Sequence, residues 1–296
     1  MTQTILLLGG DQRQEYLAAM LSQLYSRVRF LNTAEKNAGE LEEETAKADL
    51  ILLPLPFSKD QKTLFFSSGT APLVEDFLSW LHPGQQLFGW SPPPVVRDFC
   101  RENHIFCHDF SKDPEVIAQN AKLTAEGALC TAIANSPGAL CESLCLVTGW
   151  GHCGSALALM LKGMGASVTV SEIDPEKRRD AQEKGVLCLP SLIPCDSSWE
   201  ESQTPLEMFD YLFNTVPCPI FSQKLLSQTS PRITIIDLAS APGGVDFEFC
   251  RLTGRKALAA PGLPGRFCPK AAADILLKQL IPFLNPPDLS SCPQVP

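Results

Sequence analysis

Residues 144–154 read LCLVTGWGHCG, and the apolar run SALALML follows at residues 155–161. The apolar start predicts a buried strand, and the second run predicts a helix. Between them, Gly149, Gly151 and Gly154 have the spacing G-x-G-x-x-G. Strand, glycine turn and helix in this order are the context that a dinucleotide-binding fingerprint requires. The first glycine permits the tight turn, the second lets the backbone approach a pyrophosphate, and the third lets the helix pack close to the strand.

A second apolar strand is predicted at residues 167–171 and is followed by Glu172. An acid about 20 residues beyond the glycines commonly holds the ribose hydroxyls of the adenosine, and the helix N-terminus offers N–H groups to the phosphates. The alternative is a glycine turn that serves only helix–strand packing. The first interpretation assigns the cofactor to Gly149, Trp150, Gly151, His152, Cys153, Gly154 and Glu172.

Composition limits the class of protein. The chain has 296 residues, enough for two domains, and its formal charge of -9 without a basic run argues against nucleic acid as a partner. The first residues enter an apolar strand without the basic region and cleavage site of a signal peptide. No apolar run reaches the roughly 18 residues of a membrane span. We therefore expect a soluble, cytoplasmic protein with no membrane partner.

The 12 cysteines form no C-x-x-C pair. Most of them lie in apolar segments, as Cys130, Cys145 and Cys188 do, and we expect small buried side chains rather than disulfides. Cys107 and His108 belong to the only His/Cys cluster. Adjacent residues of a strand point to opposite faces, so these two are poorly placed to share a metal ion, and we expect no metal site.

Strands alternate with helices along the first 110 residues or so. The strands are predicted at residues 5–8, 28–31, 49–53, 86–89 and 105–107, with helices at 13–25, 73–81 and 95–102. This alternation is typical of a parallel sheet covered on both faces. Ligands in such sheets bind beyond the carboxyl ends of the strands, where Gly9, Gly10, Asp11 and Arg13 follow the first strand.

A long helix is predicted from Asp113 to Asn135, with Asn120, Thr124 and Gly127 on one side. That side either lines a cleft between two domains or is a solvated face with a glycine for close packing. Further strands are predicted at residues 186–188, 209–213, 233–237 and 257–260, with helices at 175–184 and 270–284. A polar loop at 196–203 and a Pro- and Ser-rich tail from residue 285, expected to be mobile, complete the chain.

Three loops follow strands at the edge of the fingerprint: residues 214–217, 238–244 and 260–266. Their glycines and prolines indicate tight loops that let a ligand contact the backbone, or else ordinary turns. We assign the nicotinamide end of the cofactor to these loops, namely to Thr215, Val216, Pro217, Leu238, Ala239 and Ser240.

The predicted fold class is α/β, with two doubly wound parallel-sheet domains. Residues 1–135 form a flavodoxin-like substrate domain with the long linking helix. Residues 136–267 form a Rossmann NAD(P)-binding domain. Residues 268–296 supply a C-terminal helix that packs back on the N-terminal domain, plus the tail.

Five motifs carry a resemblance to a known family. They are GGDxRQ at residues 9–14, NxxxTAEG at 120–127, VTGWGHCG at 147–154, DLASxPGGxD at 237–246 and APGLPG at 260–265. Together they span nearly the whole chain, and with them the sequence resembles the A-subunit family of bacterial dipicolinate synthases. The glycine fingerprint is common among dehydrogenases, whereas the other four motifs together are much more specific.

The resemblance implies an arrangement like that of the D-2-hydroxyacid dehydrogenases. It also implies NAD(P)-linked oxidation of a dihydrodipicolinate-type intermediate to dipicolinate, in the cytoplasm of the mother cell of a sporulating bacterium. The implied partner is the flavoprotein-like B subunit of dipicolinate synthase, and a homo-oligomer is a further expectation. One segment departs from the family: residues 172–175 look like those of adenosylhomocysteinase-type NAD enzymes. Glu172 favours NAD, while nearby Lys177, Arg178 and Arg179 leave NADP open.

A dicarboxylate substrate implies cationic partners. Arg13 and Arg266 are the first candidates, with Lys270 next, because arginine pairs its donors with a carboxylate. The alternative is that both are ordinary surface arginines. Glu126 and Asp11 are candidate general bases, and His152 is a weaker one. Two other functions remain open: a non-catalytic dinucleotide-binding protein that supports the B subunit, and another hydroxyacid dehydrogenase-like or adenosylhomocysteinase-like oxidoreductase.

Overall fold

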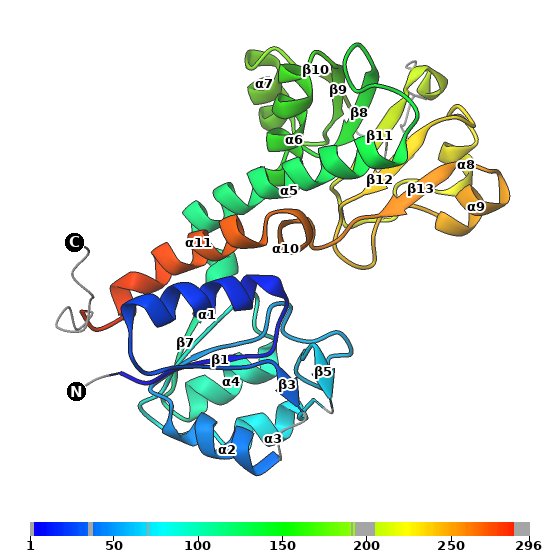
Figure 1. Cartoon of the computed structure of the whole chain (residues 1–296). Helices are drawn as coiled ribbons and strands as arrows, with labels where there is room; N and C mark the ends of the chain where they lie inside the picture. Colours follow the sequence, from blue (N-terminus) through cyan, green and yellow to red (C-terminus); the bar gives the residue numbers. More distant parts are fainter. Residues whose placement is uncertain (1–2, 35–37, 70, 191, 193–204, 287–296) are drawn as a thin grey trace. The chain divides into compact units, whose positions relative to one another are not determined.

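A computed structural model describes residues 3–34, 38–69, 71–190, 192 and 205–286. The chain divides into two compact units, one of residues 1–119 with 268–296 and the other of residues 120–267 (Figure 1). The polar loop expected at 196–203 and the tail from residue 287 lie outside the described residues. No helix in the described part of the chain has both the length and the apolar character of a membrane span.

The first unit is built on a five-stranded parallel sheet. Its strand order is β2-β1-β4-β6-β7, with β2 (Val28–Leu31), β1 (Ile5–Leu8), β4 (Leu50–Leu52), β6 (Gln86–Gly89) and β7 (Phe106–Asp109). This is the flavodoxin-like doubly wound order. All four residues of β1 are buried, which matches an uninterrupted apolar run in a sheet covered on both faces.

Helices complete this unit. They are α1 (Gln12–Leu24), α2 (Ala38–Lys47), α3 (Val74–Ser79), α4 (Pro94–Glu102), the first part of α5 (Pro114–Asn135), α11 (Pro269–Leu280) and the 3-10 turns Phe110–Lys112 and Ile281–Phe283. A two-stranded sheet joins β3 (Thr33–Ala34) to β5 (Ser68–Gly69). The C-terminal helix α11 packs along α1 (Figure 1).

The second unit is built on a six-stranded parallel sheet of order β10-β9-β8-β11-β12-β13. These strands are β8 (Leu144–Thr148), β9 (Ser167–Ser171), β10 (Leu187–Leu189), β11 (Tyr211–Asn214), β12 (Thr234–Asp237) and β13 (Lys256–Ala259). The order corresponds to the 3-2-1-4-5-6 order of the Rossmann fold. The helices are the rest of α5, α6 (His152–Gly163), α7 (Pro175–Glu183), α8 (Gln223–Leu226), α9 (Phe247–Leu252) and α10 (Leu263–Phe267), with a 3-10 turn at Leu206–Met208.

The predicted fold class and every predicted strand and helix outside the loops are confirmed to within a few residues. Three details differ. Helix α6 begins at His152 rather than Ser155, because Gly151 with its extended backbone already occupies the N-cap position. Helices α2, α8, α9 and α10 and the short strands β3 and β5 are not among the predicted elements, and α10 lies in a segment predicted to be a loop. Cys130 is exposed and Cys188 is half-buried, so the expectation of buried side chains holds only for Cys145 among the three examples.

Candidate dinucleotide-binding site

The three glycines of the fingerprint differ in what surrounds them. Gly149 has a φ of +87°, and a Cβ there would lie 2.9 Å from Thr215 Oγ1. A Cβ on Gly154 would lie 2.1 Å from the carbonyl oxygen of Gly149, so this residue is needed for helix–strand packing. A Cβ on Gly151 would meet no protein atom within 4 Å, and its φ of -81° suits any residue. Packing therefore explains two of the glycines and leaves Gly151 unexplained.

Gly151 borders a cavity of about 280 Å³ at the carboxyl edge of the sheet. The cavity is lined by the fingerprint, by the turn that follows β9 and by the loop that follows β11. Ile173, Leu192 and Ile220 give it an apolar wall, and Ile173 is exposed although it is a large aliphatic residue. Concave sites with apolar walls and a few polar groups are typical of cofactor pockets.

Glu172 is fixed at the wall of this cavity. Its side chain is 7% exposed, and its two oxygens accept hydrogen bonds from the backbone N–H groups of Trp150 (2.6 Å) and Asp174 (2.9 Å). These bonds join the acidic turn to the fingerprint. Each carboxylate oxygen retains accepting capacity beyond its one backbone donor.

The three basic residues beyond Glu172 have different surroundings. Arg178 donates from one guanidinium nitrogen to the carbonyl oxygens of Glu172 (2.8 Å) and Ile173 (2.6 Å). These two bonds stabilise the backbone of the acidic turn. Lys177 lines the cavity, whereas Arg179 is exposed and does not line it. Lys177 is therefore the basic side chain of the three that shares the cavity with Glu172.

Two side chains of the fingerprint point away from the cavity. The indole of Trp150 is 4% exposed, and its N–H donates to Oδ2 of Asp180 on α7 at 2.7 Å. The Cys153 thiol forms a hydrogen bond with Thr124 of α5, and burial raises its pKa. His152 is exposed as the first residue of α6. Trp150 and Cys153 can thus offer a cofactor only their backbone groups.

A buried polar chain, which no local sequence pattern predicts, crosses the ends of three neighbouring strands. Thr148 Oγ1 donates to Asn214 Oδ1 (2.6 Å), and Asn214 Nδ2 donates to Asp237 Oδ1 (2.8 Å). Asn214 is the register partner of both other residues, and all three are at most 3% exposed. Asp237 Oδ2 also accepts from the backbone N–H of Gly244 at 2.8 Å, so this chain sets the conformation of the loop at 238–244.

The loop after β11 contributes residues to the cavity lining, whereas the residues assigned in the loop after β12 do not. Thr215 donates from its hydroxyl to the carbonyl of Thr148 at 2.7 Å, and Thr215, Val216 and Pro217 all line the cavity. Leu238 and Ala239 are half-buried and Ser240 is exposed, and none of these three lines it. The site residues assigned to the loop after β11 therefore share the cavity with the fingerprint, whereas those after β12 lie beyond its lining.

The glycine motif of the first unit is organised by Asp11 and Arg13. Asp11 caps α1 by accepting from the backbone N–H of Arg13 at 3.0 Å, and it accepts from the Arg13 guanidinium at 2.9 Å (Nε) and 2.8 Å (Nη2). Both oxygens of the Asp11 carboxylate are therefore engaged by the Arg13 guanidinium. Gly9 is needed because a Cβ there would lie 2.1 Å from the carbonyl oxygen of Phe65.

Arg266 and Glu126 lie in the second unit, whereas Lys270 lies in the first. Arg266 is exposed on α10, with its guanidinium 5.5 Å from the centre of the Phe267 ring, and Glu126 is exposed on α5. A Cβ on Gly127 would lie 2.7 Å from Cβ of Leu263, so this glycine serves the packing of α5 against α10. Arg13 and Arg266 belong to different units, so the binding of one substrate by both arginines stays a prediction.

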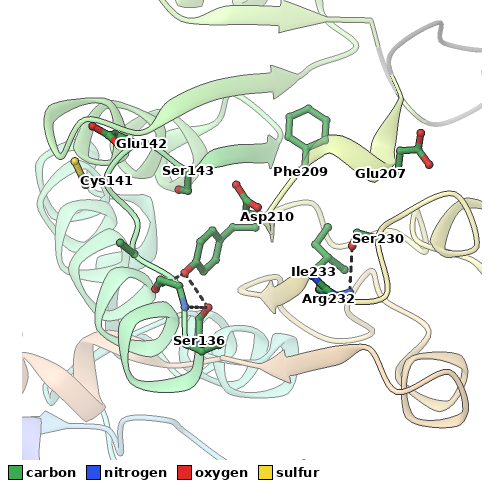
Figure 2. A pocket seen from close by; sticks show the side chains of 14 residues that line it. Ser136, Cys141, Glu142, Ser143, Glu207, Phe209, Asp210, Ser230, Arg232 and Ile233 are labelled. Atoms are coloured by element: carbon green, nitrogen blue, oxygen red, sulfur yellow. Dashed lines mark hydrogen bonds between the residues drawn. The ribbon is translucent and has the colours of Figure 1, made fainter.

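A second cavity of about 400 Å³ lies at the opposite edge of the same sheet, where β8, β11 and β12 begin (Figure 2). Glu142, Glu207, Asp210 and Arg232 line it. The Tyr211 hydroxyl at its wall is 2.8 Å from both Ser136 Oγ and the Gly138 carbonyl oxygen. None of the residues assigned to the cofactor or substrate lines this cavity.

Comparison with known proteins supports the resemblance found in the sequence. Residues 4–111 match the family model that describes the N-terminal domain of the dipicolinate synthase A subunit. The chain is also 28% identical over 293 residues to the dipicolinate synthase A subunit of Bacillus subtilis (strain 168), covering 95% of both chains. The chain is similar to this protein over nearly its whole length.

Solved structures extend this likeness to the fold. The crystal structure of the dipicolinate synthase A subunit from Bacillus halodurans superposes with a TM-score of 0.81 at 23% identity, covering 96% of this chain and 98% of that one. A 2-hydroxyacid dehydrogenase from Ketogulonicigenium vulgare Y25 superposes with a TM-score of 0.58 at 16% identity, covering 96% of both chains. The chain therefore has the fold that these dipicolinate synthase chains share with 2-hydroxyacid dehydrogenases, as expected.

Proposed function

We propose that this chain is an NAD-linked oxidoreductase that converts a dihydrodipicolinate-type intermediate to dipicolinate. The proposal is supported by the likeness to the Bacillus subtilis protein over 95% of both chains and by a fold shared with dehydrogenases. It places the protein in the cytoplasm of the mother cell of a sporulating bacterium. Its partner would be the flavoprotein-like B subunit of dipicolinate synthase, and its own assembly a homo-oligomer.

The observation that carries the dinucleotide site is Gly151. Its Cβ would project into a space that no protein atom occupies within 4 Å, and the residue lines the cavity beside Glu172. Because Gly151 also lies at the N-cap of α6 and at the edge of the cavity, the absence of a side chain there leaves space for a ligand to approach the backbone. Gly151 is the N-cap of α6, a helix of 12 residues, and the backbone N–H groups at such a helix start suit a pyrophosphate.

The preference for NAD rests on Glu172. The carboxylate is held by two backbone donors and has lone pairs left for ribose hydroxyls, whereas it would repel a 2′-phosphate. Lys177 on the same cavity would partly offset that repulsion. We therefore expect NAD to bind more tightly than NADP, with NADP still measurable.

Bound NAD would supply the hydride acceptor for an oxidation that gains aromaticity. The chain's own residues would bind and orient the substrate against it, since positioning accounts for much of such a reaction. Arg13 and Arg266 would each hold one carboxylate. Glu126 is the candidate that accepts the proton, and Asp11 is a less favourable one because it is paired with Arg13.

The test combines binding with turnover. Calorimetric titration of NAD and NADP should give a stronger signal for NAD. Addition of the dihydro intermediate should then produce reduced nicotinamide, followed by its near-ultraviolet absorbance, with and without the B subunit. NAD binding without turnover in either case would favour the non-catalytic dinucleotide-binding role. Absence of NAD and NADP binding would contradict the proposal.

A further inference from the structure

A pair of cysteines in the first unit lies outside the candidate site. Cys100 is on α4, where Val96 and Cys100 are the two buried residues of the helix. Cys107 is on β7, paired in register with Leu87 of β6. Leu87, Val96 and Cys100 belong to one hydrophobic cluster, and Cys107 packs against that cluster. The buried face of α4 thus meets the face of β7 that carries Cys107.

The neighbours of Cys107 on β7 confirm which way its side chain points. Phe106 and His108 lie on the opposite face, where both rings contact Phe88 and Phe283. Alternation along the strand therefore turns Cys107 toward α4. In the described ranges, no group of three or more His, Cys, Asp or Glu residues could hold a metal ion.

The two thiols are neighbours between α4 and β7. The hydrogen bond between Cys100 and Cys107 is the largest influence on the pKa of each thiol. The chain between them is short and fixed: the backbone N–H of Ile105 donates to the Cys100 carbonyl at 2.8 Å. Above this turn, the Arg97 guanidinium on α4 lies 4.0 Å from Asp109 at the end of β7. Helix and strand are therefore held together on both sides of the thiol pair.

The pair is chemically asymmetric. The hydrogen bond with Cys100 has the largest effect and lowers the pKa of the Cys107 thiol. Arg97 and Lys112 also lower this pKa, whereas burial and the carboxylate of Asp109 raise it. The same hydrogen bond, together with burial, raises the pKa of Cys100. Cys107 is half-buried, whereas Cys100 is only 1% exposed. A thiolate is the reactive form of cysteine, so Cys107 is the attacking sulfur and Cys100 the resolving one.

We propose that Cys100 and Cys107 are a peroxide-sensitive dithiol that closes to an intramolecular disulfide. The Cys107 thiolate attacks one oxygen of hydrogen peroxide, the O–O bond breaks, and the departing hydroxide takes a proton to become water. The resulting sulfenic acid is attacked by the sulfur of Cys100. The S–O bond then breaks, and the oxygen leaves as a second water with the proton of Cys100. Two thiols lose two electrons, and one peroxide becomes two waters.

The full-length protein tests this directly. Reduced protein is treated with hydrogen peroxide under native conditions, remaining thiols are alkylated, and the digest is examined by mass spectrometry. The expected product is a Cys100–Cys107 cross-linked peptide, two hydrogens lighter than the reduced pair and restored by dithiothreitol. It should form before appreciable oxidation at Cys145, whose thiol is buried with a pKa raised to about 11.

Variants separate the two roles. In Cys100→Ala, peroxide should leave Cys107 as a sulfenic acid that dimedone labels. In Cys107→Ala, Cys100 should stay unlabelled. Exposed Cys130, Cys141 and Cys218 serve as internal standards for non-specific oxidation. The proposal is overturned if wild-type Cys107 reacts no faster than these three, or if its oxidation yields no disulfide with Cys100. The wild-type result decides even if a variant fails to fold.

Discussion

The backbone N–H of Trp150 donates a 2.6 Å hydrogen bond to Oε2 of Glu172, so the fingerprint turn and the acidic turn are held together. The Trp150 indole is fixed at the same time by its 2.7 Å bond to Asp180 on α7. Trp150, which the sequence assigns to the cofactor, thus links the turn after β8 to the turn after β9 and to helix α7. Its side chain instead points away from the cavity and is hydrogen-bonded to α7.

Glu172→Ala should weaken NAD binding by roughly ten- to a hundredfold, because a hydrogen bond to a charged group contributes about 1.5–3 kcal/mol. NADP should lose less affinity, since the variant also removes a repulsive charge. Calorimetric titration of both dinucleotides measures the change in preference. Glu172→Gln is the matched control that keeps the size of the side chain and one accepting oxygen. Wild-type protein that binds NADP tenfold more tightly than NAD would contradict the role given to this acid.

Asp237→Ala should cost about 3 kcal/mol or more in the free energy of unfolding. It leaves one N–H of the buried Asn214 amide and the Gly244 N–H without an acceptor, and each unsatisfied buried group costs about 1–3 kcal/mol. Asp246→Ala is the control, because Asp246 caps α9 from the surface and its loss should cost about 1 kcal/mol. Denaturant unfolding compares the two. Equal losses of unfolding free energy in the two variants would show that the buried polar chain stabilises the fold no more than a surface helix cap does.

His82 gives stability a pH dependence. Its two ring nitrogens lie 3.1 and 2.9 Å from the carbonyl oxygens of Pro83 and Ala46, and these contacts raise its pKa above the usual value. The protonated ring donates to both, so its contribution is fully present below a pH of about 6.5 and is lost as the pH rises through the higher folded value. The gap in melting temperature between wild type and His82→Gln should shrink from pH ~6 to pH ~8. A gap that is constant across this range would exclude the interpretation.

Arg13→Ala and Arg266→Ala should each weaken substrate use by roughly ten- to a hundredfold while dinucleotide affinity stays nearly unchanged, because each removes charge-assisted bonds to one carboxylate. Arg13→Lys keeps the charge but not the bidentate bond to Asp11, and should show an intermediate loss. Kinetics with varied substrate at saturating NAD measure the effect. If either arginine can be removed without changing turnover, it does not hold the substrate.

Local patterns were sufficient for the strands of the two larger sheets and for the fingerprint, because each depends on a few adjacent residues. The apolar run at 144–148 and the glycines beyond it form the predicted strand and turn. Helix α2 was not predicted because few of its side chains are buried. Leu41 and Thr45 are buried, and they do not form a regular apolar stripe along the helix.

Contacts between distant segments could not be predicted in the same way. Thr148 and Asp237 end predicted strands and Asn214 directly follows one, but their hydrogen bonds exist only because β11 lies between β8 and β12 in matching register. The direction of the Trp150 indole likewise depends on where α7 places Asp180. Local patterns predict the order of the elements but not which of them become neighbours.

The measurement that tests the dinucleotide site most directly compares Gly151→Val with Gly163→Val by calorimetric titration of NAD. Both glycines have a Cβ position with no protein atom within 4 Å and no positive φ, but Gly163 ends α6 and does not line the cavity. Both variants should fold with unfolding midpoints near that of wild type. Gly163→Val should bind NAD as the wild type does, and Gly151→Val should lose at least about a hundredfold in affinity because its side chain takes the place of the pyrophosphate. Unchanged NAD binding by a folded Gly151→Val protein would contradict the site.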